Sequence, residues 1–102
     1  MYDIQFAERL IQLRTNKGVS ARDMSLSLGQ NPGYINNIES GKALPSMSVF
    51  FYICEYLQIS PKDFFDTKNN APEQLNEIIE DLKCLDTNQL TYLSPLIKDL
   101  KK

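Results

Sequence analysis

Histidine is absent from the sequence, and cysteine occurs only twice. A zinc site of the usual ligand number would therefore need both cysteines and several carboxylates, and Cys54 and Cys84 form no C-x-x-C pair. We expect two reduced thiols, with Cys54 as a small core residue, and we expect no metal and no other cofactor. The chain also lacks a nucleophile and a base at a suitable spacing, so we do not expect an enzyme.

Long apolar stretches are missing as well. No window of about 18 uninterrupted apolar residues occurs, which argues against a membrane-spanning helix. The first ten residues, MYDIQFAERL, carry charges where a secretory signal needs an apolar run. We therefore expect a cytoplasmic protein that has no membrane partner.

No excess of basic residues is present. The 102 residues include 11 Lys and Arg against 13 Asp and Glu, which gives a net charge of -2, and the sequence pI is about 5.0. Taken alone, this balance argues against a strong global attraction to nucleic acid. The length fits one small domain, or a small domain with an appendage.

Apolar residues recur at intervals of three and four positions, and no segment sustains a two-residue alternation. The pattern predicts an all-α fold made of short helices. Residues that can cap a helix N-terminus precede most of the apolar stripes; they are Ser20, Asn31, Ser46, Ser60 and Asp86. The third helix, at about residues 32–40, would have Asn31 as its N-cap and Pro32 at its first position, where proline is favoured.

The sequence divides into three parts. Residues 1–66 hold five predicted helices, and the polar segment 67–71 is typical of a linker. Residues 72–102 carry two more apolar stripes, joined at Leu85-Asp86, which predict a helical hairpin. Pro95 lies inside the second of these helices and is expected to kink it or to interrupt its hydrogen bonds.

Two short helices joined by Gly29-Gln30-Asn31 have the layout of a helix-turn-helix. Spacing alone is a weak signal, because any small helical bundle contains such turns. More specific matches are Phe6-Ala7, Arg14 and Leu28-Gly29, and above all the run IxxIExGK at residues 35–42, which is followed by Pro45-Ser46.

With these residues, segment 6–65 resembles the lambda repressor/Cro-type helix-turn-helix family, also called the XRE family. The resemblance implies a five-helix lambda repressor-like DNA-binding domain, followed here by the C-terminal helical hairpin. It also implies a sequence-specific transcriptional regulator that binds double-stranded DNA, usually as a homodimer, with the helix at about 32–40 in the major groove. A repressor is favoured because no activation segment is evident.

The resemblance further implies an ion pair between Arg14 of the first helix and Glu39 at the end of the third. An arginine fork can bind both oxygens of a carboxylate. The pair would join the recognition helix to the rest of the domain, and two independent surface charges are the alternative.

The outward face of the third helix is polar but uncharged. On a helical wheel, Ile35 and Ile38 mark its buried side, so Asn36 and Asn37 point away from it and Tyr34 lies on the flank. Asparagine can bind adenine in the major groove through two hydrogen bonds. From the resemblance we expect base contacts from Tyr34, Asn36 and Asn37, although a plain solvated face would look the same.

Phosphate contacts are expected from polar and basic residues around these helices: Lys17, Ser20, Arg22, Asn31, Ser40 and Lys42. Each of the basic residues could equally be a solubilising surface group. The chain also departs from the family's pattern, because Ala21, Pro32 and Gly33 stand where the family often has side chains that form hydrogen bonds. These departures favour a modest affinity or a greater part for DNA shape.

The apolar faces of the C-terminal hairpin need a partner. A regulator of a two-fold operator needs two copies, so we expect a homodimer through Leu75, Ile78, Ile79, Leu82, Leu90, Leu93, Ile97 and Leu100. Packing within one chain and binding of another protein are the alternatives. A second class of function also stays open, in which a protein-interaction or antitoxin-like module keeps the fold and binds DNA weakly.

Overall fold

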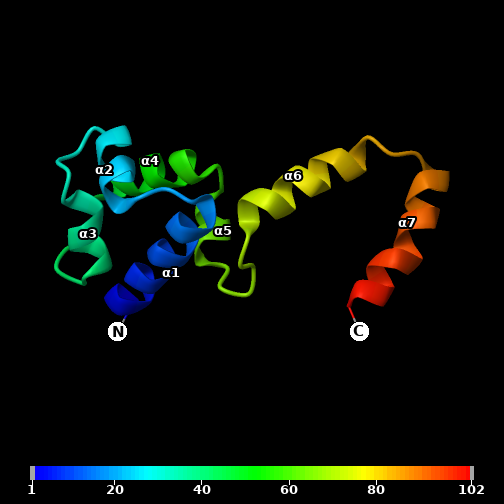
Figure 1. Cartoon of the computed structure of the whole chain (residues 1–102), viewed down its shortest axis with the longest axis horizontal. Helices are drawn as coiled ribbons and strands as arrows, with labels where there is room; N and C mark the ends of the chain where they lie inside the picture. Colours follow the sequence, from blue (N-terminus) through cyan, green and yellow to red (C-terminus); the bar gives the residue numbers. More distant parts are fainter. Residues whose placement is uncertain (1, 102) are drawn as a thin grey trace.

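The computed structural model describes residues 2–101, and within them it contains seven α-helices and no strand. The helices are α1 (Tyr2–Lys17), α2 (Ala21–Ser27), α3 (Tyr34–Glu39), α4 (Met47–Leu57), α5 (Pro61–Phe65), α6 (Pro72–Lys83) and α7 (Thr87–Leu100). Helices α1 to α5 gather into a globular unit, and α6 extends from this unit to α7 at the far end, so that the molecule measures 50 × 26 × 22 Å (Figure 1). The all-α prediction is confirmed. No helix within residues 2–101 is long and apolar enough to cross a membrane.

One hydrophobic core joins helices α1 to α5. Its buried members are Leu10, Leu13, Met24, Ile35, Ile38, Phe50, Ile53, Cys54, Leu57, Ile59 and Phe64. Aromatic rings meet at its centre, where the ring centroid of Phe64 lies 4.9 Å from that of Phe6 and 5.2 Å from that of Phe50. Burial of this apolar area is the main driving force for folding, and it fixes the positions of the helices that carry the candidate site.

The two cysteines have different surroundings. Cys54 is buried in the core, and burial raises the pKa of its thiol to about 11. The thiol therefore stays protonated at neutral pH and packs as a small apolar group. Cys84 is exposed at the end of α6, and both cysteines are free, as the sequence predicts.

Most of the predicted helix ends are present. Four expected caps accept a hydrogen bond from the amide three residues on: Ser20, Ser46, Ser60 and Asp86. Gly29 and Gly41, which follow α2 and α3, have φ values of 74° and 81°, where a residue with a Cβ would be strained. The local sequence therefore sets where these two helices stop.

The prediction for the start of the third helix is wrong in detail. Helix α3 begins at Tyr34 instead of Pro32, and its N-cap is Gly33, which has no side chain to offer. Asn31 does accept two hydrogen bonds. Its side-chain oxygen accepts from the backbone amide of Gly33 at 3.0 Å, and its backbone carbonyl accepts from the amide of Tyr34 at 3.1 Å. Gly33 has φ -92° and ψ 2°, the angles of the third residue of a type I turn. Pro32 and Gly33 therefore form a turn that leads into the helix.

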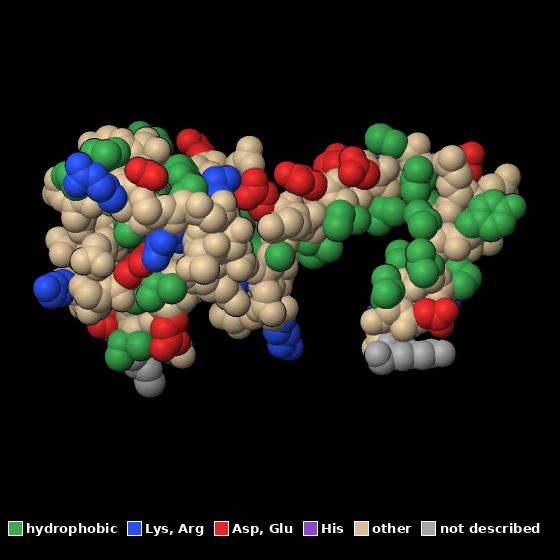
Figure 2. All heavy atoms as spheres, viewed as in Figure 1, with side chains coloured by type: hydrophobic (Ala, Val, Ile, Leu, Met, Phe, Trp, Pro, Cys, Tyr) green, Lys and Arg blue, Asp and Glu red, His purple; other side chains and the backbone are tan. Residues whose placement is uncertain are grey.

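Helices α6 and α7 follow one another through a short connection, but they open out instead of packing face to face (Figure 1). Helix α7 runs through Pro95 and has no buried residue. Leucine and isoleucine side chains of both helices stay exposed: Leu75, Ile78, Ile79, Leu90, Leu96, Ile97 and Leu100. Figure 2 shows apolar side chains along the side of α6 that faces α7. The predicted hairpin is thus an open one, and nothing within residues 2–101 covers its apolar faces.

Candidate nucleic-acid interface

The hydroxyl group of Ser25 ties α2 to α3. Ser25 is fully buried, and its Oγ donates to the carbonyl of Ala21, 2.8 Å away, and accepts from the amide of Ile35, 2.9 Å away. That amide lies in the first turn of α3, where a helix leaves its own N–H groups without partners. One side chain of α2 therefore satisfies a donor of α3 and helps to set the angle between the two helices.

Replacement of Ser25 by alanine should lower the free energy of unfolding by about 1–3 kcal/mol, because the buried amide of Ile35 would lose its acceptor. The change is measured as a shift of the urea midpoint, followed by far-UV circular dichroism. Ser27→Ala is the matched control, because Ser27 is exposed on the same helix, and it should stay close to the wild type. Equal midpoints for the two variants would contradict the role given to Ser25.

The Arg14–Glu39 ion pair expected from the resemblance is present and bidentate. Nε of Arg14 lies 2.6 Å from Oε2 of Glu39 and Nη2 lies 2.9 Å from Oε1, while Nη1 donates to the carbonyl of Val19 at 2.9 Å. The hydrogen bonds with Glu39 raise the pKa of the Arg14 guanidinium above its ordinary value, against the effect of burial. The pair holds the C-terminal end of α3 against α1, and Ser25 holds the N-terminal end.

Held in this way, α3 presents a polar outer face. Asn36, Asn37 and Ser40 are exposed, while Ile35 and Ile38 are buried, as the helical wheel predicts. The Ser40 hydroxyl donates to the carbonyl of Asn37 at 3.1 Å. The side-chain amides of Asn36 and Asn37 form no hydrogen bond within residues 2–101, so their donors and acceptors are available to a ligand.

Two cations accompany this face. Arg22 in the first turn of α2 and Lys42 just after α3 are exposed, and neither forms an ion pair with another residue of the described chain. Figure 2 shows Lys and Arg side chains at the end of the molecule where α2 and α3 lie, and a row of acidic side chains along α6. Tyr34 is half-buried against the core, and burial raises the pKa of its phenol, so its ring mainly supports the helix.

Comparison with known proteins shows which family has this arrangement of helices. Residues 7–70 match a family model described as a helix-turn-helix domain. The chain belongs to this helix-turn-helix family. It is similar to the restriction-modification controller protein C.AhdI from Aeromonas hydrophila, at 28% identity and a TM-score of 0.58, over 62% of this chain and 91% of that one. No curated protein matches the chain.

The resemblance to the lambda repressor/Cro type, and with it the lambda repressor-like fold, is thereby confirmed. The chain is a DNA-binding transcriptional regulator and not a member of an enzyme family, and α2 and α3 form its helix-turn-helix. Helices α6 and α7 begin after residue 70, so they lie beyond the segment that the family model matches.

In this helix-turn-helix domain, Lys17 is engaged within the chain. Its Nζ lies 3.3 Å from Oε2 of Glu73 at the start of α6 and 5.6 Å from the ring centroid of Tyr56. The phosphate contact expected for Lys17 stays a prediction, and it would require Nζ to leave Glu73, because the charge is paired and directed toward α6. The sequence pattern could not show the pairing, since the partner lies 56 residues further on.

Ser20 and Asn31 serve the backbone of the helix-turn-helix and keep donors for a ligand. The oxygen of Ser20 accepts from the amide of Asp23, and that of Asn31 accepts from the amide of Gly33, both at 3.0 Å. The hydroxyl proton of Ser20 and the amide protons of Asn31 stay available for phosphate. Beside them, a Cβ added at Gly33 would meet only Oδ1 of Asn31, at 3.7 Å. The exposed turn at Pro32 and Gly33 therefore lets a ligand approach the backbone closely.

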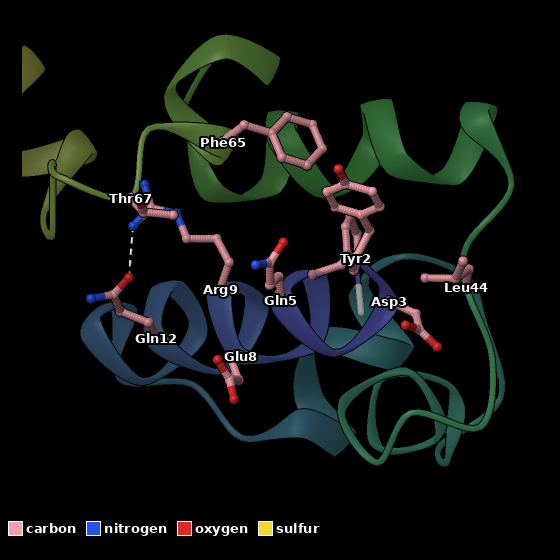
Figure 3. A pocket seen from close by; sticks show the side chains of 10 residues that line it. Tyr2, Asp3, Gln5, Glu8, Arg9, Gln12, Leu44, Phe65 and Thr67 are labelled. Atoms are coloured by element: carbon pink, nitrogen blue, oxygen red, sulfur yellow. Dashed lines mark hydrogen bonds between the residues drawn. The ribbon is translucent and has the colours of Figure 1, made fainter.

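A buried arginine that the sequence did not point to fixes α5 against α1. Arg9 is 4% exposed, and its guanidinium donates to the carbonyls of Phe64, Asp63 and Asp66, where α5 ends, and to Oε1 of Gln12. Figure 3 shows its side chain reaching from α1 toward the segment after α5. Burial lowers the pKa of Arg9 below its ordinary value, and the nearby Asp66 and Asp63 oppose this effect. The last carbonyls of α5 thus obtain the cationic partner that a helix C-terminus favours.

Proposed function

We propose that the chain is a transcriptional repressor that binds a two-fold operator as a homodimer and reads bases with α3. The outer face of α3 carries this proposal. It offers two exposed asparagines without partners in the described chain, together with two unpaired cations at the start of α2 and just after α3: Asn36, Asn37, Arg22 and Lys42.

In this proposal the two asparagines bind base edges in the major groove, adenine above all, through paired hydrogen bonds. Tyr34 contributes the exposed part of its ring. Phosphates are bound by cations and polar groups around the face: Ser20, Arg22, Asn31, Ser40 and Lys42. The net charge of -2 does not exclude such binding, because Arg22 and Lys42 stand unpaired within the described chain beside the outer face of α3, and local charge can outweigh the net charge.

For the homodimer we propose the apolar face of α6 and α7. Ile78 on α6 is 54% exposed and Ile97 on α7 is 46% exposed, and the α7 helix has no buried residue at all. A contiguous exposed apolar face usually marks an interaction site, and a second copy related by a two-fold axis would offer the same face in return. The proposed interface comprises Leu75, Ile78, Ile79, Leu82, Leu90, Leu93, Ile97 and Leu100.

Repression is the regulatory effect we propose. A dimer bound to its operator blocks the access of other proteins to that DNA, and this effect requires no additional interaction surface. The likeness to a restriction-modification controller protein supports a role in gene control. We place this activity in the cytoplasm, where such an operator would be reached.

A selection from random double-stranded DNA at low salt, followed by a salt titration, tests the proposed function. We expect a roughly palindromic motif with half-site centres about 34–36 Å apart, or a multiple of that distance. Affinity for the motif should fall steeply with salt concentration. A selection that enriches no motif at low salt would overturn the proposal.

Arg22→Ala and Lys42→Ala should each weaken binding to all sequences alike and reduce the slope of log affinity against log salt by about 1, as expected for the loss of one phosphate contact. Fluorescence anisotropy with the selected motif and a scrambled duplex measures both effects. Lys83→Ala is the control, because Lys83 lies on α6 and pairs with Glu80. Salt slopes that stay at the wild-type value in both variants would argue against these phosphate contacts.

A protein-interaction or antitoxin-like module is the second candidate, and the exposed face of α6 and α7 favours it. In that case the face would bind another protein, and DNA would be bound weakly. The DNA selection separates the two candidates, because only the repressor predicts an enriched motif.

A further inference from the structure

We propose that polar contacts between α1, α5 and the start of α6 lock the connection after α5 and thereby make the protein accept a single half-site spacing. The proposal rests on the homodimer proposed above. We call this set of contacts the α1–α6 clasp, and it comprises Gln12, Asn16, Lys17, Asp63, Asn70, Glu73 and Asn76. Segment 67–71, which the sequence suggests is a linker, is held by this clasp.

Asn70 lies at the centre of the clasp. Its Oδ1 accepts a hydrogen bond from Nε2 of Gln12 at 3.0 Å, and its backbone carbonyl accepts another from Nδ2 of Asn16. Gln12 and Asn16 are four residues apart, so both donors project from the same face of α1. The end of the connection is therefore held against α1 at two points.

The side chain of Gln12 is held in place by a buried arginine, Arg9. Its Oε1 accepts from Nη1 of Arg9 at 2.7 Å, and Arg9 is 4% exposed and bound to carbonyls at the end of α5. Since the amide oxygen of Gln12 is committed to this cation, its NH₂ group is the part that remains for Asn70. A buried arginine thus orients the glutamine, which in turn binds the connection.

The first turns of α6 are held from two sides. Nζ of Lys17 on α1 lies 3.3 Å from Oε2 of Glu73, and Nδ2 of Asn76 donates to Oδ2 of Asp63 on α5 at 3.1 Å. The hydrogen bond from Asn76 is the main cause that lowers the pKa of the Asp63 carboxyl. Pro72, the first residue of α6, is buried and has a fixed φ. Helix α6 therefore leaves the globular unit in one direction.

The clasp connects the proposed dimer face with the recognition helix. Helix α3 is fixed to α1 by Arg14 and Glu39, and α6 is fixed to α1 by the clasp, so both move as one body. In a two-fold dimer through α6 and α7, the separation of the two α3 helices is then constant. A flexible connection of the same length would instead let the two domains reach several spacings.

Two full-length triple variants isolate the clasp. The clasp variant removes polar atoms from three of its members and leaves the core intact: Gln12→Ala, Asn16→Ala and Glu73→Ala. The matched control changes exposed positions of the same two helices: Thr15→Ala, Gln74→Ala and Glu77→Ala. Both variants lose one negative charge, so a difference between them reports the contacts.

Distances between spin labels on α4 and α6 show whether the clasp holds α6. The labels are placed at the exposed positions Ser48→Cys and Asp81→Cys, in a Cys84→Ser background, and buried Cys54 stays unlabelled. Dilution with unlabelled chain restricts the signal to pairs within one chain. We expect one narrow distance distribution for the wild type and the control, and a broad one for the clasp variant. Equal widths for the two triple variants would overturn the inference.

The spacing preference on DNA gives the second readout. Two copies of the selected half-site are placed at the preferred spacing or about five base pairs further apart, half a helical turn. The wild type and the control should lose about 10²-fold in affinity at the wrong spacing, because both half-sites can no longer be bound together, and the clasp variant should lose less than about ten-fold.

The two readouts separate failure of this inference from failure of the proposed function. If the wild type enriches no motif, the proposed function fails and the spacing role fails with it, while the label distances still decide whether the clasp holds α6. If a motif is enriched but the clasp variant and the control depend on spacing equally, the proposed function stands and the inference is overturned.

Discussion

Glu39→Ala is expected to lower the free energy of unfolding by about 2–4 kcal/mol and the melting temperature by more than about 10 °C. The substitution leaves Arg14, whose side chain is only 19% exposed, without its carboxylate. Removal of one partner from a buried pair costs about 3–5 kcal/mol, and the remaining contact of Arg14 with water makes the cost smaller here. Thermal unfolding followed by circular dichroism measures the change.

Glu55→Ala is the control for Glu39→Ala, because it removes the same charge from an exposed site on α4, and it should shift the melting temperature little. A double-mutant cycle isolates the pair. Arg14→Ala combined with Glu39→Ala should cost clearly less than the sum of the single substitutions. Additive costs would contradict the role of the ion pair in holding α3.

Leu93→Asp combined with Ile97→Asp should convert the proposed dimer into a monomer and lower operator affinity by about 10²–10⁴-fold. The two aspartates place charges at the centre of the apolar face of α7, where a second copy would have to bury them. Loss of the dimer removes the linked binding of the second half-site. Sedimentation at micromolar concentration measures the mass, and anisotropy with the selected operator measures the affinity.

Asn88→Asp combined with Thr91→Asp is the matched control for the dimer prediction. Both positions are exposed on the other side of α7, and the pair adds the same charge. We expect a dimer with wild-type affinity. A wild-type chain that sediments as a monomer would rule out this interface before any variant is made.

Local signals in the sequence predicted most of the fold. Caps such as Ser46 and Ser60 act on amides three residues away, and Gly41 ends α3 through its own backbone angles. All the residues that make up such a signal lie within one turn of helix, so the signal can be recognised without knowledge of the rest of the chain. The same holds for the buried and exposed sides of α3, which follow from the spacing of its isoleucines.

The start of α3 was mispredicted because Asn-Pro-Gly favours both a helix cap and a turn. In a helix that began at Pro32, the amide of Ile35 would bind the carbonyl of Asn31. In the structure that amide binds Oγ of Ser25, and the Asn31 carbonyl accepts from Tyr34. A tertiary hydrogen bond therefore decides between two local options that the sequence leaves nearly equal.

The sequence did not reveal polar contacts whose two partners become neighbours only on folding. Arg9 binds carbonyls at the end of α5, and Lys17 binds Glu73, so each partner lies more than half the chain away. Their sequence context resembles that of solvent-exposed charges in any amphipathic helix. Neither residue is recognisable from composition or periodicity, although both help to position the elements around the DNA-binding face.

Base reading by α3 is tested most directly by parallel DNA selections with the wild type, Asn37→Ala and Asn88→Ala. Asn37 is exposed on the outer face of α3, and Asn88 is exposed on α7. We expect Asn37→Ala to lose about 1–3 kcal/mol of discrimination at one base position in each half-site and to keep the others. Asn88→Ala should select the wild-type motif. An Asn37→Ala motif identical to that of the wild type would contradict base reading by this residue.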